Sequence, residues 1–202
     1  MGVFQHWPNR ITALRFVGAL VLFSLFAIYG DEENAEAIRW KIHVAFWLFI
    51  GVAATDFLDG YLARRGNQVS AFGRIADPFV DKVLIVGAMV YLSVMPWSRD
   101  LLPASVVVII LAREFLVTAI RGYVESIGQE FPADWFGKVK MIVQCVAVAA
   151  VMWVDAFAWP AGWDAFWRDL ALVLVYLTLA TTLGSGLSYV WRTRQLLVGE
   201  RS

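Results

Sequence analysis

Six long stretches of mostly apolar residues constrain this chain more than any other feature, because each is long enough to cross a lipid bilayer. A bilayer core of about 30 Å needs roughly 20 such residues in a helix. The predicted spans are residues 11–29, 40–62, 77–95, 102–124, 139–158 and 170–191. A helix satisfies its own backbone hydrogen bonds, as lipid requires. We therefore expect an all-α integral membrane protein with six transmembrane helices in one domain, residues 1–202.

The composition supports a membrane location and excludes other classes of protein. The chain is 60% hydrophobic and 17% charged, which lies outside the usual range of soluble domains. Its 17 basic and 17 acidic residues balance, so no positive excess favours nucleic-acid binding. The single cysteine, Cys145, excludes an internal disulfide. No cleavage site follows the first span, so we expect that it is not a cleavable signal peptide. We expect residues 1–9, which include Phe4 and Trp7, to form a short helix at the membrane interface.

Basic residues gather on one side of the predicted spans. An even number of spans places both termini on the same side, and 12 basic residues fall on or near that side against four on the other. The positive-inside rule places the richer side in the cytoplasm. We expect a multi-pass protein of a bacterial-type inner membrane, with cytoplasmic termini and a cytoplasmic loop between the second and third spans.

Two aspartates lie near the cytoplasmic end of the second span. Charged groups inside spans are costly, so they are functional hypotheses by default. Asp56, Asp59, Gly60 and Ala63 follow the spacing i, i+3, i+4, i+7, which places them on one helix face. Small residues on such a face either allow close helix packing or leave room for a bulky ligand beside the carboxylates.

The third span adds two more aspartates. Gly73, Asp77 and Asp81 are four residues apart and share a face of the next helix. A short loop makes the two helices antiparallel neighbours, so four carboxylates converge. They need about two compensating positive charges to stay ionised together. Hard oxygen ligands suit Mg²⁺ or Mn²⁺, and neither His6 nor His43 is placed to help.

The pattern Asp-x₂-Asp-Gly-x₂-Ala-Arg-x₈-Gly-x₃-Asp-x₃-Asp, complete from Asp56 to Asp81, resembles the signature of the CDP-alcohol phosphotransferase family. The resemblance implies a six-helix membrane enzyme that displaces CMP from a CDP-linked alcohol with a second alcohol, and it makes Asp81 the base. It implies two Mg²⁺ or Mn²⁺ ions, bound by Asp56, Asp59, Asp77 and Asp81. It implies a CDP-lipid site formed by Asp56, Asp59, Gly60, Ala63, Arg64, Gly73 and Asp77.

Three cations near the aspartates are candidates for binding the phosphate of the second substrate. Arg113 and Arg121 lie two turns apart in the fourth span, at the level of Lys138 in the fifth. The alternative for Arg113 is a buried ion pair, but its neighbour Glu114 points about 100° away, so we expect these two residues to be poorly placed to pair. For Lys140 we favour a position that faces lipid headgroups.

The segments around these cations, with residues 8–15, resemble the branch of the family that makes phosphatidylglycerol phosphate. Met141 stands where that branch usually has threonine, and Arg10 where an apolar residue is common. The resemblance implies phospholipid biosynthesis, with CDP-diacylglycerol as donor and glycerol 3-phosphate as acceptor, among membrane lipids. A cardiolipin synthase and an inositol-phosphate-using relative are the alternatives. A cation transporter is disfavoured because all four aspartates lie toward one side. Small residues on several spans permit a homodimer.

Overall fold

The computed structural model describes residues 7–66, 71–128 and 135–199, and every regular element in these ranges is an α-helix. The helices in chain order are α1 (Trp7–Tyr29), α2 (Ala35–Gly66), α3 (Ala71–Val94), α4 (Ala104–Ser126), α5 (Trp135–Ala156) and α6 (Trp163–Gly199). Each predicted span therefore corresponds to one helix. Several helices are longer than predicted, most of all α6 with 37 residues.

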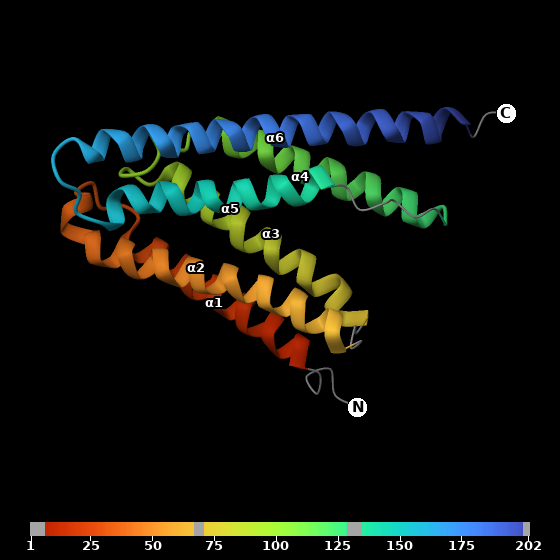
Figure 1. The fold of residues 1–202 in the computed structure, drawn as a ribbon, viewed down its shortest axis with the longest axis horizontal. Coiled ribbons are helices and arrows are strands. Elements are labelled where there is room, and N and C mark those ends of the chain that lie inside the picture. The colour runs from red at the N-terminus through yellow and green to blue at the C-terminus, as the bar shows by residue number, and fades with distance from the viewer. Residues whose placement is uncertain (1–6, 67–70, 129–134, 200–202) are drawn as a thin grey trace.

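The six helices run alternately up and down between two ends of the molecule (Figure 1). The start of α1 and the end of α6 lie at one end, together with the end of α2, the start of α3, the end of α4 and the start of α5. This end is called the motif end below. The near-parallel α5 and α6 form one side of the molecule, α1 and α2 form the other, and α3 crosses obliquely between them.

In the part of the chain that the structure describes, four helices contain a segment long and apolar enough to cross a membrane. These segments are Asn9–Tyr29, Ala35–Thr55, Gly137–Ala156 and Trp163–Trp191. The helices α3 and α4 have similar lengths of 24 and 23 residues. Charged residues interrupt the apolar sequence of both helices, among them Asp81 in α3 and the adjacent Arg113 and Glu114 in α4. These charges explain why α3 and α4 do not count among the four apolar helices.

The N-terminal segment differs from the expectation of a separate interfacial helix. Trp7, Pro8 and Asn9 already belong to α1, and residues 1–6 lie outside the part of the chain that the structure describes. Proline is well tolerated in the first turn of a helix, because its missing N–H has no partner there. The first membrane helix therefore begins four residues before the predicted span, at Trp7.

Close approaches at glycine hold α1 against α2 and α3. A Cβ atom built at Gly18 would lie 2.6 Å from Val52 Cγ2 on α2, and one at Gly87 would overlap the ring of Phe23. Small residues allow such backbone contacts between membrane helices. Gly18 is one turn from Arg15, and Gly87 is less than two turns from Asp81, so the close packing brings these two charged residues within reach of each other.

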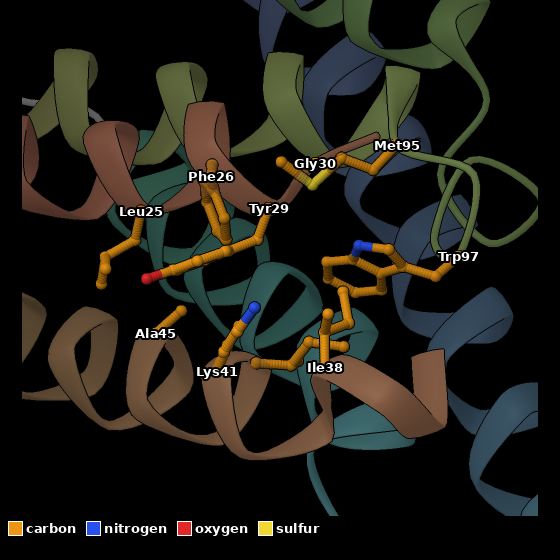
Figure 2. Close-up of a pocket in the computed structure, with 10 residues that line it drawn as sticks. Leu25, Phe26, Tyr29, Gly30, Ile38, Lys41, Ala45, Met95 and Trp97 are labelled. Atoms are coloured by element: carbon orange, nitrogen blue, oxygen red, sulfur yellow. The ribbon is translucent and has the colours of Figure 1, made fainter. Parts of the chain in front are cut away.

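Apolar and polar buried residues occupy different halves of the bundle. The apolar core lies away from the motif end, where Leu22, Phe49, Leu92 and Met152 are at most 1% exposed. Beside it, a small cavity between α1, α2 and the end of α3 is lined by Phe26, Ala45, Met95, Trp97 and others (Figure 2). Its volume of about 10 Å³ is about what one water needs.

Most buried polar residues lie in the half toward the motif end. They are Asn9, Thr12, Arg15, Arg113, Glu114, Lys140, Gln144, Thr178, Thr182, Ser185 and Thr193. Burying polar groups is costly unless they bond to each other or serve a ligand. This half of the bundle is therefore where a functional site is expected.

Candidate active site

The aspartate motif spans the end of α2 and the first half of α3, at the motif end of the bundle (Figure 1). The helix α2 continues without interruption through Asp56 and Asp59, and α3 through Asp77 and Asp81. The backbone therefore has the helical register that the spacing predicted. The side chains of Asp56, Asp59, Gly60, Ala63, Arg64, Gly73 and Asp77 lie outside the described residues, so the metal and CDP-lipid sites stay predictions.

Asp81 forms an ion pair with Arg15 of α1. The side chain of Arg15 is 3% exposed and that of Asp81 is 20% exposed. The guanidinium fixes the direction of this carboxylate, which the family resemblance implies to be the base. From the sequence, Arg15 was one of the basic residues expected on the cytoplasmic side, and its contact with Asp81 was not predicted. The missed signal is the spacing of Asn9, Thr12 and Arg15, which are three residues apart in α1 and all buried.

A second charged group joins α4, α5 and α6. Glu114 forms ion pairs with Lys140 and with Arg113, whose Nη1 lies 3.1 Å from Glu114 Oε1. All three residues are at most 8% exposed. The expectation that Arg113 and Glu114 are poorly placed to pair is therefore wrong. It considered only the directions of the Cα–Cβ bonds, whereas the long arginine side chain bends back to its neighbour.

Lys140 also differs from its expected position facing lipid headgroups. It is 5% exposed and donates a hydrogen bond to Glu114. Lys138, two residues earlier, points elsewhere because residues two apart lie about 200° apart around a helix. Lys138 is exposed and takes no part in the contacts of this group. Its predicted role in phosphate binding stays a prediction.

The two predicted arginines both contact α6. Arg113 donates a hydrogen bond to Ser185 Oγ, and its Cζ lies 5.7 Å from the centre of the Tyr189 ring. Arg121 Nη2 donates to the hydroxyl oxygen of Tyr189 at 3.0 Å. The structure therefore brings Arg113 and Arg121 to the same residue, Tyr189. The sequence alone did not indicate a role for this tyrosine.

Lys82 connects the aspartate helix to the cation helix. Its Nζ donates to Thr118 Oγ1 at 2.6 Å, and Thr118 Oγ1 donates to the backbone oxygen of Glu114 at 2.7 Å. Lys82 directly follows Asp81 in α3, while Thr118 lies between Glu114 and Arg121 in α4. The predicted base and the predicted phosphate-binding residues are thus on helices joined by a direct hydrogen bond.

Tyr189 belongs to a polar stripe on α6 that runs toward the motif end. The stripe consists of Thr178, Thr182, Ser185, Tyr189 and Thr193, which are at most 6% exposed. Their spacing of three or four residues places them on one face of α6. The periodicity is visible in the sequence, but it lies within an apolar span that shows no charged residue. The stripe can accept hydrogen bonds from the cations of α4.

A family model described as CDP-alcohol phosphatidyltransferase matches residues 5–184. The range contains Arg15, the complete aspartate motif, Arg113, Glu114 and Lys140, and it ends just before Ser185.

Three relatives share the name CDP-diacylglycerol–glycerol-3-phosphate 3-phosphatidyltransferase. The protein of Bacillus subtilis (strain 168) is 35% identical over 149 residues, which cover 72% of this chain and 75% of the relative. Those of Shigella flexneri serotype 5b (strain 8401) and Escherichia coli (strain K12) are each 33% identical over 196 residues, which cover 96% of this chain and 97% of the relative.

Proposed function

The chain belongs to the CDP-alcohol phosphatidyltransferase family, and from this premise we propose that it transfers a phosphatidyl group from CDP-diacylglycerol to glycerol 3-phosphate. The products are phosphatidylglycerol phosphate and CMP. The relatives that match nearly the whole chain carry the name of this activity. The family and the four apolar helices make the chain a multi-pass membrane protein.

The excess of cations around Glu114 is the observation that carries the choice of acceptor. Among the residues that the structure describes, Arg113 and Lys140 pair with the Glu114 carboxylate, Lys82 reaches its backbone through Thr118, and Arg121 shares Tyr189 with Arg113. Cations therefore outnumber the carboxylate of this described group, and such an excess of positive charge favours the binding of an anion. A phosphate on a small soluble acceptor meets this requirement, whereas a neutral alcohol would leave the charges uncompensated.

The donor set of the aspartate motif fits a divalent metal pair. Asp56 and Asp59 are three residues apart in α2, Asp77 and Asp81 are four apart in α3, and both segments lie at the motif end of the bundle (Figure 1). Carboxylate oxygens are the ligands that Mg²⁺ and Mn²⁺ prefer. When bound, two such ions would neutralise charge on the diphosphate of the donor.

Asp81 is the proposed base. Its carboxylate accepts the proton of the primary hydroxyl of glycerol 3-phosphate as that oxygen attacks the phosphorus attached to diacylglycerol. The bond from this phosphorus to the oxygen of CMP breaks, and CMP leaves. Arg15 holds the carboxylate in place, while Gly60, Ala63, Arg64 and Gly73 border the CDP pocket.

All six helices cross the membrane in this proposal, including α3 and α4. The buried charges of α4 pair within the protein, which removes much of the cost of placing them in lipid. The excess of basic residues at the motif end supports a cytoplasmic location for both termini and for the active site, where glycerol 3-phosphate is available. A homodimer remains a prediction, to be checked by mass measurement in detergent.

Release of CMP by the purified protein tests the proposal. We expect release from CDP-diacylglycerol to require glycerol 3-phosphate and Mg²⁺ or Mn²⁺. Asp81→Asn removes the proton acceptor but keeps the shape of the side chain, so turnover should fall by about 10²-fold or more. Activity of this variant close to that of the wild type would contradict the role of Asp81.

A further inference from the structure

Arg113 and Arg121 come from α4, eight residues apart, yet both contact Tyr189 of α6. Arg121 Nη2 lies 3.0 Å from the Tyr189 hydroxyl, and Arg113 Cζ lies 5.7 Å from the centre of the ring. Tyr189 is 2% exposed, whereas Arg121 is exposed. A fixed, buried side chain therefore holds a long side chain that would otherwise sample many rotamers. The contacts restrict both arginines to one arrangement.

The chemistry of these contacts leaves the arginine charges available. A tyrosine hydroxyl and an aromatic ring are neutral, so they orient a guanidinium without cancelling its charge. Arg113 also donates to the neutral Ser185 hydroxyl, and its carboxylate partner Glu114 is shared with Lys140. A guanidinium has five N–H donors, and Tyr189 uses one from Arg121. The remaining donors can bind phosphate oxygens.

We propose that Tyr189 is a positioning residue that aligns Arg113 and Arg121 for the phosphate group of the acceptor. The inference deepens the proposed function and rests on it for the identity of the acceptor. Tyr189 acts through the two arginines and does not touch the reacting atoms. It lies beyond the residues that the family model matches, which end at residue 184.

The test compares Tyr189→Phe with Tyr176→Phe in the full-length protein. The first change removes the hydroxyl that accepts from Arg121 but keeps the ring beside Arg113. The second change is the control: it removes a tyrosine hydroxyl from an exposed position of the same helix, where Tyr176 is 53% exposed. We expect Tyr189→Phe to raise KM for glycerol 3-phosphate about three- to tenfold, which is the range expected for the loss of one typical hydrogen bond. Its kcat and its KM for CDP-diacylglycerol should match the wild type, as should all constants of Tyr176→Phe.

A double-mutant cycle shows whether Tyr189 acts through Arg121. Because Arg121 is exposed, we expect Arg121→Gln to fold as the wild type does, and it should raise KM for glycerol 3-phosphate on its own. If Tyr189 acts through Arg121, adding Tyr189→Phe to this variant should change KM by less than about twofold. Additive effects of the two changes would overturn the proposal, as would an unchanged KM in Tyr189→Phe or a lower kcat with KM unchanged.

Binding without turnover separates this inference from the proposed function. The rise in Tm of the purified protein with added glycerol 3-phosphate reports acceptor binding alone. Failure of the wild type to respond would refute the proposed acceptor and with it the role of Tyr189 in binding it. A wild-type response that Tyr189→Phe retains at the same concentrations would refute the positioning role and leave the acceptor standing.

Discussion

Replacing Gly186 with alanine should weaken binding of glycerol 3-phosphate, because the added methyl group would press on Arg113. A Cβ atom built at Gly186 lies 3.1 Å from Arg113 Cγ, whereas nonbonded carbon atoms prefer about 3.5–4.0 Å. The stem of Arg113 must therefore move by about 0.4 Å or more. The guanidinium at its end contacts Ser185 and Tyr189, so the displacement reaches the group proposed to bind phosphate.

The size of the effect follows from this displacement. A misplacement of about 1 Å can reduce activity about 10²-fold. A shift of about 0.4 Å then corresponds to about sixfold, if the logarithm of the effect scales with distance. We expect KM for glycerol 3-phosphate to rise by about three- to tenfold, with kcat nearly unchanged. The fold itself should tolerate the change, because alanine is favoured over glycine in a helix by about 0.5–1 kcal/mol.

Gly184→Ala is the matched control for this prediction. It adds the same methyl group two residues away on α6, where the built Cβ meets no atom of another helix within 4 Å among the described residues. Initial rates of CMP release are measured in detergent micelles while glycerol 3-phosphate is varied, and the Tm of each variant is recorded. A wild-type KM in Gly186→Ala would refute the reasoning, as would an equal rise in Gly184→Ala.

Two further predictions concern buried ion pairs. Arg15→Gln breaks the ion pair with Asp81 and should lower the free energy of unfolding by about 3–5 kcal/mol. Arg39→Gln is the control: it breaks an exposed pair with Glu36 and should lower the free energy of unfolding by less than about 1 kcal/mol. Equal Tm values for these variants would argue against the importance of the Arg15 contact. Glu114→Gln leaves Arg113 and Lys140 buried without a carboxylate and should also lower the free energy of unfolding by about 3–5 kcal/mol. Adding Lys140→Met removes one of the unpaired charges and should restore part of the lost Tm. A wild-type Tm in Glu114→Gln would contradict this prediction.

The helices and the register of the aspartate motif were predictable because both depend on local sequence. Apolar stretches of sufficient length indicate membrane helices, and the spacing of Asp56 and Asp59, or of Asp77 and Asp81, specifies a shared face within one continuous helix. The ends of the helices were less predictable. The helix α6 extends past its predicted span to Gly199, because the polar residues 192–195 interrupt the apolar pattern without ending the helix.

The partners of the charged residues were not predictable, because they join distant parts of the chain. Arg15 and Asp81 are 66 residues apart, and Arg121 and Tyr189 are 68 apart. Helical periodicity gives the face of a residue but not the helix that packs against that face. Lys140 shows the consequence: its sequence context suggested a lipid headgroup, whereas packing places it against Glu114.

The identity of the lipid product tests the central claim most directly. Purified protein is given CDP-diacylglycerol with equal concentrations of glycerol 3-phosphate, inositol phosphate and phosphatidylglycerol, and the products are identified by mass spectrometry. The cation group around Glu114 favours an acceptor that carries a phosphate, and the proposed function, which rests on the activity named for the relatives, makes that acceptor glycerol 3-phosphate. Phosphatidylglycerol phosphate is therefore the predicted main product. Cardiolipin or a phosphatidylinositol phosphate as the main product would contradict it.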